Sequence, residues 1–460
     1  MRKLSNRSSN RPDRSGWRDY QNRLGNGVGS GCRRRCLTRL LAVLLVVAGF
    51  YGLNGLWREG GGSDRSGTAQ ASLPKTSVPE LTSKQDLRKL FNRRASLIGN
   101  LATGEIELSV NQQLLQVKTS LDEDLQSYLL DKMDRKNSRY IGIVVMEADT
   151  GRVLAMAGFD KTEEAGNPCL RGDYPAASIF KIVTAASAVD ACGLNAESKL
   201  GFNGYKHTLY KRQLKEGNNR YTSTVSLKDA FAQSINPVFG KIGQLRLGKS
   251  LLAKSAEAFG FNGLLDFELP LQPSRFLIGD QPYNWAEIAS GFNRETTMSP
   301  LHGAVMVTAV LNEGSMVAPS LVDEIDDPDG KTLYSRKPPA MHPAMSANAS
   351  AVLGQLMETT IASGTSRKAF RGYQRDKILS RLQIGGKTGS IGNTSQDARI
   401  DWFVGFAKER QGTKQLAVAV MVAHEEYIGI RASQYARMAM TRYFGSHPAE
   451  ADPKKSGKSS

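Results

Sequence analysis

A serine and a lysine lie three residues apart at the start of an apolar helical stretch, residues 172–190. Positions i and i+3 of a helix share one face, about 5–6 Å apart at Cβ, so the amine of Lys181 can reach the hydroxyl of Ser178. A serine hydroxyl is a weak nucleophile until a base removes its proton, and a lysine serves as that base only when it is neutral. Burial and a nearby second cation both favour the neutral amine. The stretch therefore predicts a nucleophilic serine with a lysine base.

Two further short patterns accompany this pair, Ser234-Ile-Asn236 and Lys387-Thr388-Gly389. Each pattern alone is weak, because similar triplets occur elsewhere in the chain. Their context separates them, since the copy at 72–75 is interrupted by a proline in a linker and the copy at 455–457 lies in a polar tail. The chosen patterns adjoin apolar segments and follow the order helix, loop, strand. We therefore expect the three patterns to meet in one site.

The positive charge of the chain is concentrated at its beginning. The net charge is +17, and residues 1–39 hold eleven Lys and Arg against two Asp. The body of the chain shows no zinc-finger spacing, no aromatic-studded sheet motif and no basic helix of the kind that nucleic-acid-binding proteins use. We therefore expect no nucleic-acid partner, and residues 1–36 read as a basic cytoplasmic tail.

An apolar stretch at residues 40–57 has about the ~18–20 residues needed to cross a bilayer. Four arginines, at positions 33, 34, 35 and 39, stand directly before it, so the positive-inside rule keeps the N-terminus in the cytoplasm. A cleaved signal peptide is the alternative, with Ala69-Gln-Ala71 as its cleavage site, but the basic region is too long for one. The sequence predicts an uncleaved single-pass anchor in the cytoplasmic (inner) membrane, with the remaining chain on the periplasmic or extracellular side.

The cysteines and histidines predict no metal centre. Cys169 and Cys192 flank the Ser178 helix, and a disulfide between them is possible in an exported domain. Cys32 and Cys36 lack further ligands for zinc, and the five histidines show no metal-binding spacing. No cofactor is expected either.

The order of the elements predicts an α+β fold. A helix is expected from a capping-box pattern at 120–123, then a hairpin over residues 140–157, a long helical and loop region, three strands and a closing helix. The expected strands are 383–390, 401–407 and 415–422, and the helix is 432–443. The expected domains are a tail at 1–36, an anchor at 37–57, a linker and small stalk at 58–115, the main domain at 116–445 and a tail at 446–460. Within the stalk we expect a helix at 84–97 and strands at 105–108 and 114–118.

The three patterns resemble the active-site motifs of the serine penicillin-recognising enzymes, and more closely those of the penicillin-binding protein transpeptidases. Further stretches resemble this family in the right order, at residues 119–126, 149–156, 230–237, 259–261 and 401–406. The resemblance implies a β-lactamase/transpeptidase-like fold, with a central antiparallel sheet of about five strands packed between helices.

The resemblance also implies a role for each residue of the patterns. Ser178 would be the acylated nucleophile, Lys181 its base, and Ser234 a relay of a proton to the leaving group. Asn236 would hold the substrate amide, while Lys387 and Thr388 would bind a terminal carboxylate. The backbone N–H groups of Ser178 and Ser390 would form an oxyanion hole. Glycines at 385, 386 and 389 would leave the strand edge bare, so that a peptide could add to it as a further strand.

The function implied is that of a membrane-anchored peptidoglycan D,D-transpeptidase that cross-links stem peptides and is acylated by β-lactams. A D,D-carboxypeptidase differs only in the acceptor, which is water. A non-catalytic β-lactam sensor or scaffold on the same fold is a third alternative, and a β-lactamase is disfavoured because a Glu-x-x-Leu-Asn segment is absent. The expected partners are stem peptides, β-lactams, the bilayer through residues 40–57 and a separate glycan polymerase. The polymerase is expected because only about eighty residues separate the apolar stretch from the first strand of the main domain, too few for a polymerase domain.

Overall fold

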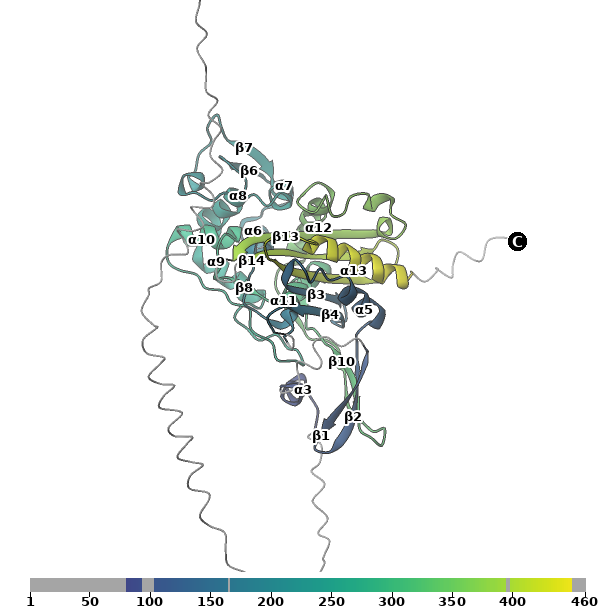
Figure 1. Ribbon diagram of the computed structural model, residues 1–460. Helices are drawn as coiled ribbons and strands as arrows, with labels where there is room; N and C mark the ends of the chain where they lie inside the picture. Colours follow the sequence, from purple (N-terminus) through teal and green to yellow (C-terminus); the bar gives the residue numbers. More distant parts are fainter. Residues whose placement is uncertain (1–79, 93–102, 164–165, 394–397, 449–460) are drawn as a thin grey trace, which may run out of the picture. The chain divides into compact units, whose positions relative to one another are not determined.

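The computed structural model describes residues 80–92, 103–163, 166–393 and 398–448 (Figure 1). All of these residues fall in one compact unit. Within them, no helix combines the length and the apolar character needed to span a bilayer. The predicted tail at 1–36, the anchor at 37–57 and most of the C-terminal tail lie outside the described residues.

A five-stranded antiparallel sheet forms the centre of the unit, in the order β13-β14-β15-β3-β4 (Figure 1). Its strands are β3 (Ser138–Glu147), β4 (Val153–Asp160), β13 (Leu382–Asn393), β14 (Ala398–Glu409) and β15 (Gln415–His424). The pairing of β15 with β3 joins the early hairpin to the three late strands. The predicted central sheet of about five strands is confirmed, and the two ends of the domain meet in it.

Helices cover both faces of this sheet because its strands carry apolar side chains on both faces. Along β3, Val144 and Met146 belong to one hydrophobic core, and Ile143 and Val145 belong to the other. The second core is closed by α5 (Glu123–Asp131) and α13 (Ala432–Ser446), and the first by a group of helices that includes α6 (Lys181–Cys192) and α11 (Pro300–Leu311). The sequences of these strands are nearly continuous apolar runs, because both faces of the sheet are buried.

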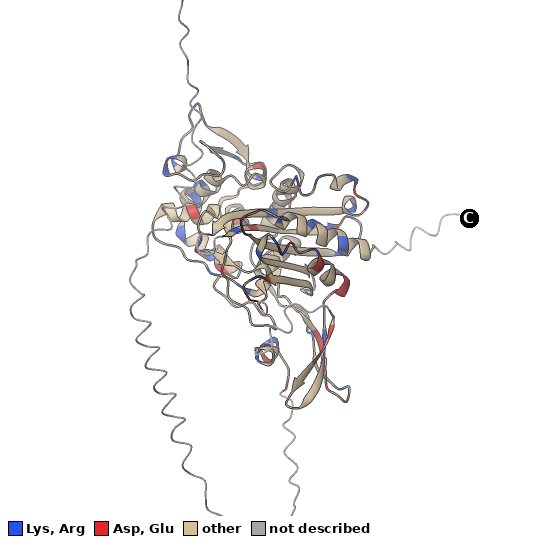
Figure 2. Ribbon diagram, viewed as in Figure 1, with Lys and Arg blue, Asp and Glu red and all other residues tan. Residues whose placement is uncertain are grey.

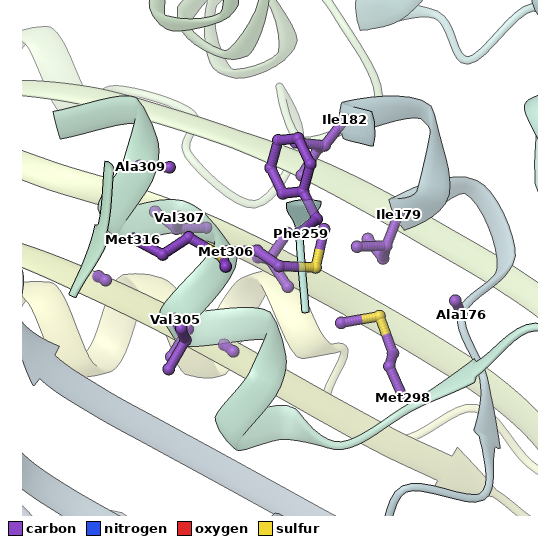
Figure 3. Close-up of a cluster of buried hydrophobic side chains, with 14 of the residues drawn as sticks. Ala176, Ile179, Ile182, Phe259, Met298, Val305, Met306, Val307, Ala309 and Met316 are labelled. Carbon is purple, nitrogen blue, oxygen red and sulfur yellow. The ribbon is translucent and has the colours of Figure 1, made fainter. Parts of the chain in front are cut away.

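The helix α6 lies inside the first core. Ile182, together with Ile179 from the turn before it, packs near Phe259 and the α11 residues Met306 and Val307 (Figure 3). Nine consecutive residues of α6, from its first position to Val189, are buried. The helix ends where Gly193 adopts a left-handed conformation with φ 62°. This burial fixes the start of the helix, and with it the predicted nucleophile, against the centre of the protein.

The region between the hairpin and the late strands is mostly helical, as predicted. Its helices are α7 (Leu227–Ala232), α8 (Asn236–Lys241), α9 (Gly248–Ala258), α10 (Pro282–Ser290), α11 and α12 (Ala347–Ala362). The side chain of Ser299 caps α11, and Pro300 occupies the first turn of this helix. Three strand pairs were missed there, namely β5 (Tyr174–Pro175) with β8 (Thr297–Met298), β6 (Lys199–Phe202) with β7 (Ser223–Ser226), and β9 (Ser315–Val317) with β12 (Met341–Pro343). Strands of two to four residues are too short to show an apolar period.

A second sheet has the order β1-β2-β10-β11. It joins β1 (Glu105–Val110) and β2 (Gln113–Thr119) to β10 (Val322–Asp326) and β11 (Thr332–Ser335). Lys118 of β2 forms ion pairs of 2.6 and 3.0 Å with Glu324 and Asp326 of β10. Figure 2 shows that basic and acidic positions both occur along this sheet. The predicted stalk strands exist, but the boundary predicted between residues 115 and 116 falls inside β2. The stalk sheet is completed by strands from the main domain, and sequence order alone does not reveal such long-range pairing.

One local prediction was wrong, and one possibility that the sequence left open is not realised. The helix after residue 120 is capped by Asp122, whose side chain accepts from the N–H of Leu125, whereas Ser120 donates to the carbonyl oxygen of Val153 at 2.8 Å. Ser120 was the expected cap. Its side chain is instead used in the hydrogen bond to Val153, and Asp122, two residues later, caps the helix. The possible disulfide is absent, because Cys169 and Cys192 are both free thiols and Cys169 is buried against the sheet. The helix predicted at 84–97 is described as α3 (Lys84–Phe91), and its predicted end lies outside the described residues.

Candidate active site

The predicted nucleophile and base are in contact. Ser178 lies in a short 3₁₀ turn, Ala177–Phe180, and Lys181 is the first residue of α6. The Nζ atom of Lys181 lies 2.8 Å from the Oγ atom of Ser178. Ala177, directly before the serine, has a positive φ of 48°, a strained conformation for a residue other than glycine. This tight turn brings the serine hydroxyl to the amine of the lysine.

The amine of Lys181 is fully buried and its other two partners are neutral. Its Nζ lies 2.8 Å from Oδ1 of Asn236 and 2.5 Å from the carbonyl oxygen of Ser290. Burial, and then repulsion from Lys387, hold the pKa of Lys181 well below its usual value. A neutral amine has two N–H bonds, which suit Asn236 and Ser290, and one lone pair, which is left for the proton of Ser178. The geometry is therefore that of a base.

Two backbone carbonyl groups, about thirty residues earlier in the sequence, orient Asn236. Its backbone N–H donates to the carbonyl oxygen of Lys206 at 2.7 Å, and its Nδ2 donates to the carbonyl oxygen of His207 at 3.1 Å. With its amino group held there, the amide turns its oxygen toward Lys181. The sequence offered no sign of this role for residues 206 and 207, because backbone carbonyl groups are present in every residue.

Lys387 and Ser234 form a second contact of the same kind. The Nζ of Lys387 donates to Oγ of Ser234 at 3.0 Å and to the carbonyl oxygen of Thr388 at 2.7 Å. Burial lowers the pKa of Lys387 to about 7. Ser234 has a positive φ of 55°, so the loop that carries it is strained as well. The two predicted lysines thus lie at one site, each hydrogen bonded to a serine of a different pattern.

The strand β13 is an edge strand of the sheet and lies against the serine turn. A Cβ atom at Gly389 would lie 3.3 Å from Ala177 and from Ile179, so glycine allows this close approach. At positions 385 and 386 the reason for glycine differs from the prediction that these residues leave the strand edge bare for a peptide. A Cβ at Gly385 would meet the ring of Phe406 at 2.4 Å, and one at Gly386 would meet the ring of Phe403 at 2.4 Å. Glycine at these two positions leaves space for the aromatic side chains of β14.

The remaining predicted residues also lie on β13. Thr388 Oγ1 is 2.6 Å from Oγ1 of Thr365, and Ser390 Oγ donates to Oδ1 of Asp401 at 3.0 Å. A side chain of β14 continues this support, because Trp402 Nε1 donates to the carbonyl oxygen of Pro175 at 2.9 Å, just before the serine turn. Trp402 is buried, as expected for a core residue. The structure thus brings all three patterns together, and the catalytic role of each residue stays a prediction.

Sequence reasoning missed the end of α10. Gly291, with a φ of 65°, packs so tightly that a Cβ there would lie 1.9 Å from the carbonyl oxygen of Ala177 and 2.8 Å from the backbone nitrogen of Ser178. Together with the Ser290 carbonyl, this glycine holds the serine turn and its base. A serine-glycine pair after an apolar run indicates only a helix end, so the sequence held no signal for the contact.

Comparisons with known proteins identify the family of this chain. The model of the penicillin binding protein transpeptidase domain matches residues 141–441. The chain is 25% identical over 329 residues to stage V sporulation protein D of Bacillus subtilis, covering 66% of this chain and 49% of that protein. It is also 25% identical over 319 residues to the peptidoglycan D,D-transpeptidase PbpA of Mycolicibacterium smegmatis, covering 61% of each. The chain thus spans about half to three fifths of the length of these relatives.

Solved structures share the fold. The D,D-transpeptidase domain of a peptidoglycan glycosyltransferase from Eggerthella lenta matches with a TM-score of 0.59 and 22% identity, over 72% of this chain and 83% of that one. The penicillin G acyl-enzyme complex of penicillin-binding protein A from M. tuberculosis matches with a TM-score of 0.55 and 22% identity, over 72% and 80%. The family model covers well over half of the sequence and spans all three patterns. The chain therefore belongs to the penicillin-binding protein transpeptidase domain family.

Proposed function

We propose that this protein is a peptidoglycan D,D-transpeptidase that forms a serine acyl-enzyme. The observation that carries the proposal is the 2.8 Å contact between Ser178 and Lys181, a fully buried lysine whose pKa lies well below its usual value. Such a pair has no evident use in stabilising the fold, because burying a lysine without an acidic partner is costly. The relative from Mycolicibacterium smegmatis carries the name peptidoglycan D,D-transpeptidase.

In the proposed acylation, Lys181 takes the proton of Ser178 while Oγ attacks the carbonyl carbon of the penultimate D-Ala of a stem peptide. The C–N bond then breaks, the acyl group remains on Oγ as an ester, and the amine of the terminal D-Ala leaves after gaining a proton. Ser234, whose Oγ accepts a hydrogen bond from Lys387, gives its own proton to this amine and takes in exchange the proton that Lys181 removed from Ser178, so that Lys181 is neutral again. An amine on a neighbouring strand attacks the ester next, loses its proton to the same base, and restores Ser178.

Three further groups complete the proposed site. Asn236 holds the amide of the substrate, and Lys387 with Thr388 receives the terminal carboxylate. The backbone N–H groups of Ser178 and Ser390 stabilise the oxyanion, each donor contributing about 10²–10³ in rate. The close packing of Gly389 against the serine turn supports this pairing of β13 with Ser178. A β-lactam would acylate the same serine.

We extend the proposal to the location of the enzyme. Residues 40–57 would anchor it in the cytoplasmic membrane, with the described unit on the periplasmic or extracellular side, as the arginines before the apolar stretch favour. A separate glycan polymerase would supply the strands to be cross-linked. These parts of the proposal rest on the sequence.

Labelling by penicillin and turnover of peptides test the proposal. Purified wild-type protein should gain the mass of one penicillin, and Ser178→Ala should gain none. Ser187→Ala is the matched control, since Ser187 is a buried serine of α6, the helix that follows the Ser178 turn, and lies outside the three patterns. Covalent labelling of Ser178→Ala would refute the assignment of the nucleophile.

A donor stem peptide with an acceptor amine then separates the three functions. Cross-linked product indicates the transpeptidase, and release of D-Ala with only the shortened acid indicates the carboxypeptidase. Labelling by penicillin without any peptide turnover indicates a sensor or scaffold.

A further inference from the structure

A turn that the three patterns do not include lies against the predicted carboxylate site. After α12 ends, the N–H of Thr365 donates to the carbonyl oxygen of Ala232 at 3.0 Å. The neighbouring Gly364 packs so closely that a Cβ there would lie 2.5 Å from the same oxygen. Ala232 is the last residue of α7, two positions before Ser234. The turn is therefore fixed to the same support as the Ser234 loop.

This turn brings the side chain of Thr365 to β13. The hydroxyl oxygens of Thr365 and Thr388 lie 2.6 Å apart, and Thr365 is exposed while Thr388 is half-buried. One hydroxyl donates its hydrogen to the other, so one hydroxyl hydrogen remains free whichever way the bond points. The pair therefore presents one free donor next to Lys387.

A carboxylate needs more than the donor that Lys387 supplies. The Nζ of Lys387 already donates to Ser234 and to the carbonyl oxygen of Thr388, so at most one of its three N–H bonds is free for a ligand. Hydroxyl groups donate strong, short hydrogen bonds to carboxylates. A bond between two accessible hydroxyls contributes little to the stability of the fold, because water competes for both.

We infer that Thr365 acts with Thr388 as a two-hydroxyl donor for the terminal carboxylate of the donor peptide, and that it selects substrates ending in a free carboxylate. This inference rests on the proposed function. In the free enzyme the two hydroxyls bind each other, and when the carboxylate arrives each hydroxyl turns its hydrogen to one of the carboxylate oxygens. Thr365 is thus a substrate-binding residue supplied by the end of α12, outside all three sequence patterns.

The test compares two forms of one β-lactam. The second-order rate constant for acylation of Ser178 is measured with a fluorescent penicillin as the free acid and as its methyl ester. Thr365→Val should lower the constant for the free acid about tenfold, as expected for the loss of a hydrogen bond to a charged group, and leave the ester nearly unchanged. Thr365→Ser should restore the free-acid rate, and Thr365→Asp should lower it further by repulsion.

Thr359→Val is the matched control, because Thr359 lies near the end of α12, shortly before the turn that carries Thr365, and its hydroxyl donates to the carbonyl oxygen of Gln355. It should behave like the wild type with both reagents. An equal loss with acid and ester in Thr365→Val, or no loss with either, overturns the inference while wild-type labelling leaves the proposed function standing. Wild-type protein that takes up neither reagent overturns the proposed function and the inference together.

Discussion

Lys181 lies 2.5 Å from the carbonyl oxygen of Ser290, the last residue of α10. The last carbonyl groups of a helix carry partial negative charge, so they stabilise a cation beside them. Burial favours the neutral amine in the resting site by lowering the pKa of Lys181, and the Ser290 carbonyl stabilises the amine when it takes the proton of Ser178. The end of α10 therefore belongs to the machinery of the base.

Gly291→Ala should disable the site through its backbone. The new Cβ would lie 1.9 Å from the carbonyl oxygen of Ala177, so the serine turn must move. A displacement of about 1 Å can cost about 100-fold in rate. We expect a loss of this size in the acylation rate, measured with a fluorescent penicillin.

Gly193→Ala is the control for that variant. Gly193 ends α6 with φ 62°, close to the 65° of Gly291, but a Cβ there meets no atom within 4 Å. It should lower the free energy of unfolding by about 1–2 kcal/mol, the usual cost of a left-handed residue with a side chain, and leave acylation unchanged. Equal acylation rates in the two variants would contradict the role given to Gly291.

The pH dependence of acylation should report Lys387. Its pKa is lowered to about 7 by burial, and only the protonated form attracts a carboxylate. Above about pH 7 the protonated fraction of the free enzyme falls up to tenfold per unit, so the second-order constant for a free-acid penicillin should fall with it. Lys387→Arg keeps the charge and should move this decline to higher pH. A wild-type profile flat from pH 7 to 9 would show that the charge of Lys387 is not needed.

Asn236→Asp should raise the pKa of the base. The new carboxylate would stand where the amide oxygen now lies, 2.8 Å from Lys181 Nζ. An opposite charge at this distance favours the protonated amine by about 1–3 pKa units. We expect the acid side of the acylation profile to shift to higher pH by at least one unit. Asn236→Ala should slow acylation without such a shift, and an identical profile for both variants would argue against direct contact with the base.

Glu268 should make stability depend on pH. Its carboxylate is buried, accepting from Ser320 Oγ at 2.6 Å and from the N–H of Leu321 at 3.1 Å, and burial raises its pKa. Above the unfolded value of about 4.3 the folded protein binds more protons at this site than the unfolded chain, so its contribution to stability falls as pH rises. Glu268→Gln should remove this pH-dependent contribution. The measurement is the free energy of unfolding of the wild type minus that of the variant, which should fall between pH 4.5 and 7. A constant difference over this range would rule the effect out.

Much of the site could be predicted because its residues are close in sequence or carry rare chemistry. Ser178 and Lys181 are one helical turn apart, so local geometry alone predicted their contact. Lys387 was identified because a cation within an apolar strand has few structural reasons to be there. The hairpin over 140–157 and the three late strands were predicted because strands buried on both faces form long apolar runs.

The rest depended on contacts between segments far apart in the chain. Ser290, Gly291 and the carbonyl groups of residues 206 and 207 act through their backbones, which look alike in every sequence. Thr365 was invisible for a related reason, because a threonine after a glycine indicates only a turn. The stalk boundary failed because β10 returns to pair with β2 across about 200 residues. The sequence by itself determined which groups do the chemistry, since side-chain type and helical spacing are local properties. Only the tertiary structure decided what holds those groups, because burial, backbone partners and close approach arise when distant segments pack together.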